Sequence, residues 1–191
     1  MVLEVTKLGE DILRQVAEPV KEVNDEIRQM AEDMFETMIA KDGVGLACPQ
    51  IGKSLRMFVI IAADDVRRVF INPQIIKTSE EVGEYDEGCL SIPQVYETIT
   101  RPLAVTVQAL NEKGRPFTLE ADGFLARIIQ HEYDHLNGIL YIDRGDAEFA
   151  KKTEAQFKKR AERAAEKAKE KEAKAKKIAA KLAAKEQKKN K

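Results

Sequence analysis

Residues 123–137 read GFLARIIQHEYDHLN, and two patterns coincide in this stretch. Phe124, Ile128 and His131 recur at intervals of three and four residues, the spacing of one face of an α-helix. His135 follows one turn later on the same face. The stretch therefore predicts an amphipathic helix that carries both histidines on one side.

The two histidines and the glutamate between them form the pattern HExxH of zinc proteases. Because residues four apart share a helix face, the imidazoles of His131 and His135 can reach one cation, with Glu132 beside them. Five letters alone indicate a metal site weakly, and two histidines on a polar helix face are the plain alternative. These two are the only histidines in the chain, which favours a shared role.

A catalytic ion needs a third protein ligand and one open position. The extended protease pattern would place a third histidine where Tyr141 stands, and a later carboxylate, at best Glu154, is a further alternative. Cys89 is the better candidate, because a thiolate is a strong ligand for a borderline-soft metal and Gly88 allows close backbone approach. A lone cysteine is otherwise read as a small buried residue.

The sequence before this helix carries one further helix signal and several strand signals. Asn24 followed by two acidic residues is typical of a helix start, and Asp42–Gly43 ends the apolar periodicity that follows. Predicted strands cover residues 56–63, 69–76, 103–110 and 116–121. Strands that precede and surround one buried helix predict an α+β fold, with antiparallel strands around the helix that carries HExxH.

Charge divides the chain into two parts. Residues 1–150 hold 15 Lys and Arg against 27 Asp and Glu, whereas residues 151–191 hold 17 against 6, together with 11 alanines. The second part has too few large apolar residues for a core, and its alanine and lysine favour helix. We expect a catalytic domain over 1–148 and a basic tail over 149–191, either helical or disordered.

The sequence predicts a cytoplasmic protein without a membrane segment. Residues 1–10 mix charges with single apolar residues, unlike a secretory signal. The longest apolar run, residues 57–63, is far shorter than the ~18 residues of a membrane span. Cys48 and Cys89 are the only cysteines, too few for a disulfide scaffold.

Three segments resemble, in order, the motifs of bacterial-type peptide deformylases. They are GVGLA at 43–47 with Gln50, EGCLS at 87–91, and QHEYDH at 130–135. Each is modest alone, but the ordered set is specific, and the resemblance extends over residues 1 to about 148. It implies a compact α+β fold and a hydrolase that removes the N-formyl group from the methionine of nascent polypeptides, releasing formate.

The resemblance also implies roles for individual residues. The implied ligands of one divalent metal ion are Cys89, His131 and His135. Fe(II) is the common ion of the family, and zinc, nickel and cobalt are alternatives. Glu132 would accept a proton from the attacking water and return it to the leaving amine. The side-chain amide of Gln50 and the backbone N–H of Leu90 would donate to the developing oxyanion.

The substrate pocket is partly predicted by geometry. Phe124 and Ile128 lie on the metal-facing stripe of the predicted helix, where they can wall an apolar pocket for the methionine side chain. Val44 and Tyr85 match pocket positions of the family, and Gly45 would pair with an extended peptide by strand addition. The plain alternative is that these apolar side chains belong to the core.

The resemblance implies a formyl-Met peptide as substrate and the ribosome as a partner of the basic tail. The tail lacks interleaved aromatic residues, so base recognition is not indicated, and a solvated helix without a partner is the alternative. We expect a monomer. Two rival functions are an HExxH metallopeptidase, disfavoured by the lack of a third ligand after His135, and a non-enzymatic ribosome- or RNA-binding protein without a metal.

Overall fold

The computed structural model describes the backbone of residues 1–189 and the side chains of residues 1–176. The helices are α1 (Asp25–Ala40), α2 (Gly123–His135) and α3 (Ala147–Lys189), with short 3-10 helices η1 (Asp11–Arg14), η2 (Cys48–Ile51) and η3 (Tyr141–Arg144). The strands are β1 (Gly45–Ala47), β2 (Met57–Ile61), β3 (Arg67–Thr78), β4 (Val82–Cys89), β5 (Ile92–Pro102), β6 (Ala104–Leu110) and β7 (Pro116–Asp122). The chain divides into two compact units, Met1–Ala150 and the remainder.

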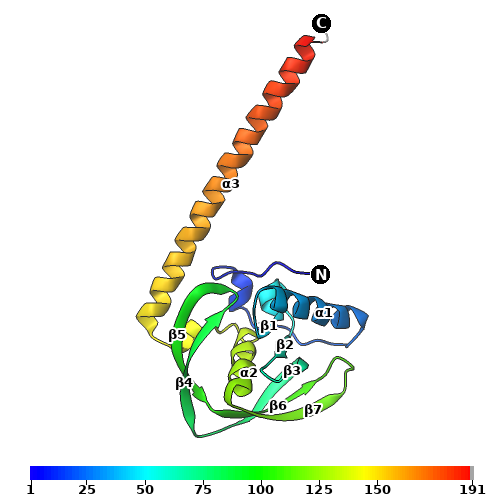
Figure 1. Ribbon diagram of the computed structural model, residues 1–191, viewed down its shortest axis with the longest axis vertical. Helices are drawn as coiled ribbons and strands as arrows, with labels where there is room; N and C mark the ends of the chain where they lie inside the picture. The colour runs from blue at the N-terminus through cyan, green and yellow to red at the C-terminus, as the bar shows by residue number, and fades with distance from the viewer. Residues whose placement is uncertain (190–191) are drawn as a thin grey trace. The chain divides into compact units, whose positions relative to one another are not determined.

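Five strands form one antiparallel sheet in the order β1-β2-β3-β6-β7 (Figure 1). Phe58 of β2 is paired with Phe70 of β3, and their rings stack with centroids 4.7 Å apart. The register of β3 against β6 shifts between Ile71 and Gln74. Pro73 lies in this shift, as expected of a residue that cannot donate to the ladder.

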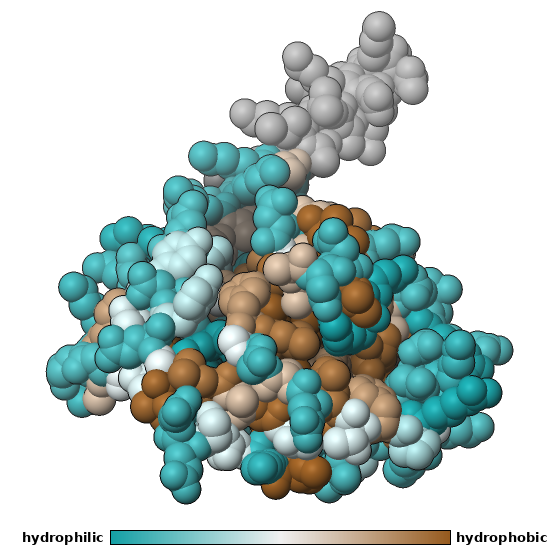
Figure 2. Space-filling model, turned by 60° about the horizontal axis from the view of Figure 1, so that its bottom comes forward, coloured by the Kyte–Doolittle hydropathy of each residue, from teal (hydrophilic) through white to brown (hydrophobic). Residues whose placement is uncertain are grey.

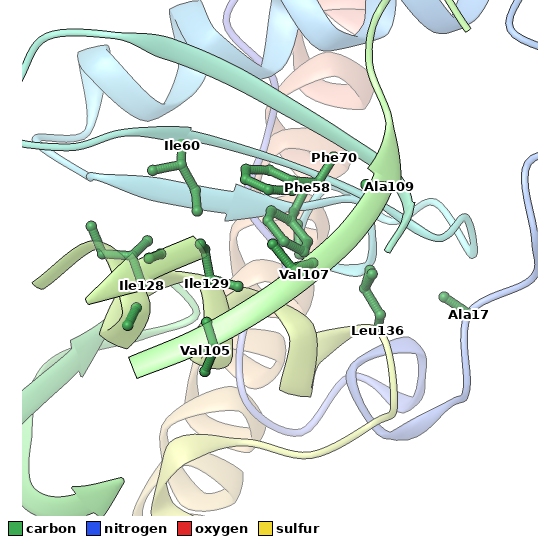
Figure 3. Close-up of a cluster of buried hydrophobic side chains, with 13 residues drawn as sticks. Ala17, Phe58, Ile60, Phe70, Val105, Val107, Ala109, Ile128, Ile129 and Leu136 are labelled. Atoms are coloured by element: carbon green, nitrogen blue, oxygen red, sulfur yellow. The ribbon is translucent and has the colours of Figure 1, made fainter. Parts of the chain in front are cut away.

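The helices α1 and α2 cover opposite faces of the sheet. Successive side chains of a strand point to opposite faces, so each strand contributes to the packing of both helices. On β2, Phe58 and Ile60 join the hydrophobic cluster that α2 completes, whereas Met57 and Val59 join the cluster that α1 completes. Figure 3 shows Ile129 of α2 among the side chains that the sheet contributes to the first cluster. The core therefore consists of two layers, one on each side of the sheet.

Both predicted helices of the body are present. The side chain of Asn24 accepts a hydrogen bond from the Ile27 N–H at 3.1 Å, which caps the start of α1. α2 is followed by Gly138, which has a φ of +70°. A Cβ at this position would overlap the backbone of Arg14, so conformation and close packing both require glycine. The chain turns sharply here and leads into η3.

The strands β4 and β5 form a separate two-stranded sheet that the sequence did not predict. The hairpin is attached to α2 through Arg127, whose guanidinium donates to the carbonyl oxygens of Gly83 at 2.7 Å and Ile99 at 2.9 Å. Few of its side chains face a core, so it lacks the apolar alternation that marks a strand in sequence. This hairpin carries Cys89 to the helix with the histidines.

The C-terminal segment is helical as far as the structure describes it, and α3 continues to Lys189. Glu172 and Lys176, which are four residues apart, form an ion pair at 2.7 Å on its surface. The α+β class and the C-terminal helix are thus confirmed. Within the described residues, no helix has the length and apolar character that a membrane crossing requires.

Candidate functional site

The side chains of Cys89, His131 and His135 meet where the β4–β5 hairpin approaches α2. Their ligand atoms all lie within 4.8 Å of one another. The Sγ of Cys89 is 3.3 Å from the Nε2 of His135. The structure therefore brings together the three residues that the sequence proposed as metal ligands, and Glu154, the alternative third ligand, is not part of this group.

The electrostatics of this cluster favour a thiolate. Burial alone would raise the pKa of Cys89, but His135 and His131 outweigh it and hold the pKa well below its ordinary value. The pKa of His131 is raised well above its ordinary value, because Cys89 and Glu87 outweigh the lowering caused by burial. A thiolate is the form of cysteine that binds metal ions.

The carboxylate of Glu87 fixes the orientation of His131. The Nδ1 of His131 lies 2.9 Å from the Oε2 of Glu87, which leaves Nε2 as the ligand atom. Burial opposes ionisation of Glu87, but its bonds with His131 and Arg101 prevail and lower its pKa to about 2. On the second histidine, the Nδ1 of His135 is buried without a hydrogen-bond partner among the described groups.

Arg101 connects the hairpin to α2 through two buried ion pairs. Its Nε lies 2.6 Å from the Oε1 of Glu87, and its Nη1 lies 2.6 Å from the Oδ2 of Asp134. All three side chains are at most 5% exposed. Arg144 also contacts Asp134, at 2.5 Å. No local sequence signal identifies Arg101, because its partners lie 14 and 33 residues away.

Glu132 is buried beside the cluster. It is 3% exposed, and burial raises its pKa to about 7. Its Oε2 has no hydrogen-bond partner among the described groups. A Cβ at Gly45 of β1 would overlap the Glu132 carboxylate, so the glycine is what makes room for this side chain. A carboxyl group with this pKa can both accept and donate a proton near neutral pH.

The amide of Gln50 is held in one orientation. Its Oε1 accepts a hydrogen bond from the Ala47 N–H at 2.8 Å, which turns its Nε2 toward the cluster. The Nε2 lies 3.4 Å from the Sγ of Cys89 and 3.3 Å from the Oγ of Ser91. Leu90, the other proposed oxyanion donor, lies in the turn between β4 and β5. The two proposed donors thus come from different elements of the fold.

A cavity of about 510 Å³ opens onto this group, and Cys89, His131, Glu132, Gln50 and Leu90 all line it. All five predicted pocket residues line it too: Val44, Gly45, Tyr85, Phe124 and Ile128. The rings of Tyr85 and Phe124 have centroids 5.6 Å apart, and both side chains are partly exposed. Ile128 is 4% exposed and belongs to the core cluster as well. Figure 2 shows hydrophobic residues gathered in the middle of one face of the molecule and hydrophilic residues around them.

Comparison with known proteins gives a consistent result. The sequence model of the family described as polypeptide deformylase matches residues 2–153. A peptide deformylase of Treponema pallidum is 52% identical over 144 residues, which cover 75% of this chain and 88% of that protein. A peptide deformylase of Fusobacterium nucleatum is 49% identical over 146 residues, covering 75% of this chain and 84% of the relative.

Solved structures agree. A peptide deformylase of Synechococcus elongatus in complex with actinonin has a TM-score of 0.75 and 45% identity, covering 78% of this chain and 81% of that one. A peptide deformylase of Ehrlichia chaffeensis has a TM-score of 0.80 and 33% identity, covering 84% and 97%.

The fold and the Cys–His–His group define a metal-dependent hydrolase with its histidines on one buried helix. More specifically, the chain belongs to the polypeptide deformylase family. It is an enzyme whose reaction is removal of the N-formyl group from nascent polypeptides.

Proposed function

We propose that Cys89, His131 and His135 hold one divalent metal ion and that the cavity beside them is the active site. The convergence of these three side chains, with ligand atoms within 4.8 Å, carries the proposal. The donor set fits such an ion, because a cysteine that favours the thiolate and two imidazoles suit a borderline-soft metal. The bond from Glu87 to His131 is the outer support that metal-binding histidines usually have.

Glu132 is the proton carrier of the reaction. When bound, the ion supplies positive charge that lowers the pKa of a water molecule and polarises the formyl carbonyl. Glu132 accepts the proton of the attacking water and then gives it to the amine that leaves. Its burial and its pKa of about 7 suit both steps. The C–N bond of the formamide breaks, and the products are formate and a free N-terminal amine.

Gln50 and Leu90 stabilise the oxygen on which negative charge develops. The Nε2 of Gln50 is aimed at the site because Ala47 holds the other end of the amide. The backbone N–H of Leu90 is the second donor. A donor that is held in position needs little rearrangement during the reaction, and the bond from Ala47 holds Gln50 in this way. Removal of one such donor typically costs about 10²- to 10³-fold in rate.

The methionine side chain of the substrate occupies the apolar part of the cavity. Ile128 forms its buried wall, and Tyr85, Phe124 and Val44 form its half-exposed rim. β1 stands at the end of the strand order and Gly45 lines the cavity, so an extended peptide in the cavity would add to the sheet along β1. Replacement of the N-terminal methionine of a test peptide by a charged residue should raise KM strongly, because the pocket offers that charge little solvation.

The native ion is proposed to be Fe(II), with zinc, nickel and cobalt as possible occupants. The support is the match of the three motifs to a family that commonly uses Fe(II). One experiment tests whether a metal is bound, which metal it is, and whether the activity depends on it. Protein purified without oxygen is analysed for its elements and assayed for formate release from a formyl-Met peptide. We expect one equivalent of metal, mainly iron, and an activity that chelation removes. Activity without any metal would overturn the proposal.

The basic C-terminal segment is proposed to bind the ribosome, and the enzyme is proposed to act as a monomer in the cytoplasm, where nascent chains are made. Residues 151–191 hold 17 basic and 6 acidic residues, and this excess of positive charge supports an RNA partner. Co-sedimentation with ribosomes at low salt tests this for the full chain and for a chain that ends at residue 150. Equal co-sedimentation of the two would remove the docking proposal. Light scattering tests the monomer.

A further inference from the structure

The turn that carries Leu90 has little support from its own hairpin. Leu90 and Ser91 form a two-residue connection between Cys89 and Ile92. Two-residue hairpins favour turns with positive φ, yet both Leu90 and Ser91 have negative φ. The register also breaks next to this tip, because Gly88 is paired with Tyr96 whereas Cys89 is paired with Ile92. Three residues of β5, including Gln94 with a φ of +63°, bulge between these pairs.

The support comes instead from the N-terminal segment of the chain. The Lys7 ammonium donates to the carbonyl oxygen of Leu90 at 2.7 Å, and the Leu8 N–H donates to the carbonyl oxygen of Ser91 at 3.0 Å. Both carbonyl groups of the turn are therefore held by two consecutive residues. Val5 and Leu8 are 4% and 6% exposed, so core packing fixes the backbone on both sides of Lys7.

The same segment also holds the element that carries Gln50. The Thr6 N–H donates to the carbonyl oxygen of Gln50 at 2.8 Å, and the Thr6 hydroxyl donates to the carbonyl oxygen of Pro49 at 3.1 Å. Residues 6–8 thus connect η2 with the tip of the β4–β5 hairpin. These are the two places from which the proposed oxyanion donors come.

We propose that Lys7 is a positioning residue of the reaction. Its ammonium holds the carbonyl group of Leu90, and so fixes the backbone of the residue whose N–H is the other proposed donor, beside the Gln50 amide. The proposal rests on the proposed function, which assigns the oxyanion to Gln50 and Leu90. Lys7 is the only member of the connection whose contribution comes from a removable charged side chain, because the bonds of Thr6 and Leu8 are mainly backbone bonds.

Lys7 also lines the cavity, together with Lys41. A general effect of positive charge on the substrate is therefore the competing explanation. The two explanations predict different kinetics. A positioning residue changes kcat for every substrate, because it acts on a donor that is used in the transition state. A charge that attracts substrate changes KM, and does so mainly for peptides with acidic side chains.

The test compares Lys7→Met, Lys7→Arg and Lys41→Met, with neutral and acidic formyl-Met tripeptides as substrates and with bound metal measured in each protein. We expect Lys7→Met to lower kcat about tenfold for both substrates at unchanged KM and metal content. This loss is smaller than the roughly 10²-fold or greater loss on removal of a whole donor. Lys7→Arg should recover most of the activity, whereas any effect of Lys41→Met should be on KM for the acidic peptide and not a loss of kcat for both substrates.

Amide hydrogen exchange provides a readout independent of turnover. The Leu8 N–H, which donates to the Ser91 carbonyl of the same turn, should exchange faster in Lys7→Met than in the parent, whereas the melting temperature should stay nearly the same. Three results would each overturn the proposal. Lys7→Met could keep a kcat within twofold of the parent, Lys41→Met could lose as much kcat as Lys7→Met, or the effect of Lys7→Met could be confined to KM for acidic peptides. Gln50→Ala distinguishes failure of this proposal from failure of the proposed function. If Lys7→Met and Gln50→Ala are both fully active, the assignment of the oxyanion donors is wrong; if only Lys7→Met is fully active, only the role of Lys7 is wrong.

Discussion

The body of the chain and its C-terminal helix are stabilised in different ways. In residues 1–150, two hydrophobic clusters enclose a five-stranded sheet, and side chains distant in sequence meet in buried pairs. From residue 158 to residue 176 every side chain of α3 is exposed, and this part of the helix relies on alanine-rich local propensity and on surface pairs such as Glu172 with Lys176. Only long-range packing can hold a sulfur and two imidazoles together, so we expect the chemistry to depend on the body alone.

The largest effect should follow from Cys89→Ala. Loss of the thiolate leaves two imidazoles, which should bind the ion much more weakly, and formate release should fall by more than about 10³-fold. Elemental analysis and a formate assay measure both effects.

Cys48→Ala is the matched control for that variant. Cys48 is fully buried, its Sγ lies 3.7 Å from the Sδ of Met34, and burial raises its pKa. This thiol is therefore part of the core, and its loss should leave metal content unchanged. Loss of metal in the control but not in Cys89→Ala would reverse the assignment of the two cysteines.

Glu132→Gln should separate metal binding from proton transfer. The amide has the size of the carboxyl group but cannot accept the proton, so kcat should fall by roughly 10²- to 10⁴-fold while the metal stays bound. Glu120→Gln, an exposed position on β7, serves as the control and should retain full activity. Near-normal turnover by a metal-loaded Glu132→Gln protein would exclude Glu132 as the proton carrier.

Arg101→Met should reduce stability through the buried pairs of the body. Removal of the guanidinium leaves Glu87 and Asp134 with fewer partners in a buried setting, and the cost should be about 3–5 kcal/mol in the free energy of unfolding. Arg67→Met breaks the exposed pair with Glu32 and the cation–π contact with the Phe35 ring, and should cost less, at most about 2 kcal/mol. Chemical denaturation compares the two, and equal costs would argue against a structural role for the buried network.

The smallest effect should follow from removal of the C-terminal segment after residue 150. Formate release from a short peptide should stay within about twofold of the full chain, because all candidate site residues lie before this point. A large loss of turnover on a free peptide would show that the body does not act alone.

Much of this architecture could be predicted from local patterns. The apolar spacing and the Asn24 cap predicted α1, and the spacing of Phe124, Ile128 and His131 predicted α2. These signals are local because each helix buries one stripe of its own residues. The strand predicted over 103–110 corresponds to β6, in which every second side chain is buried.

The β4–β5 hairpin and the pairing of its residues could not be predicted in this way. β4 is largely exposed, so no alternation marks it, and β1 is only three residues long. The buried Arg101 received no role from the sequence, because its value depends on Glu87 and Asp134 being brought to it by the fold. The position of Lys7 over the Leu90 turn was likewise a consequence of tertiary structure.

Metal reconstitution tests the central claim most directly. Chelated protein is titrated with Fe(II) without oxygen, and formate release is measured at each addition for the parent and for Cys89→Ala. We expect the activity of the parent to rise linearly to a plateau at one equivalent and the variant to stay inactive. Full activity of the chelated parent, or a plateau of equal height in Cys89→Ala, would contradict it.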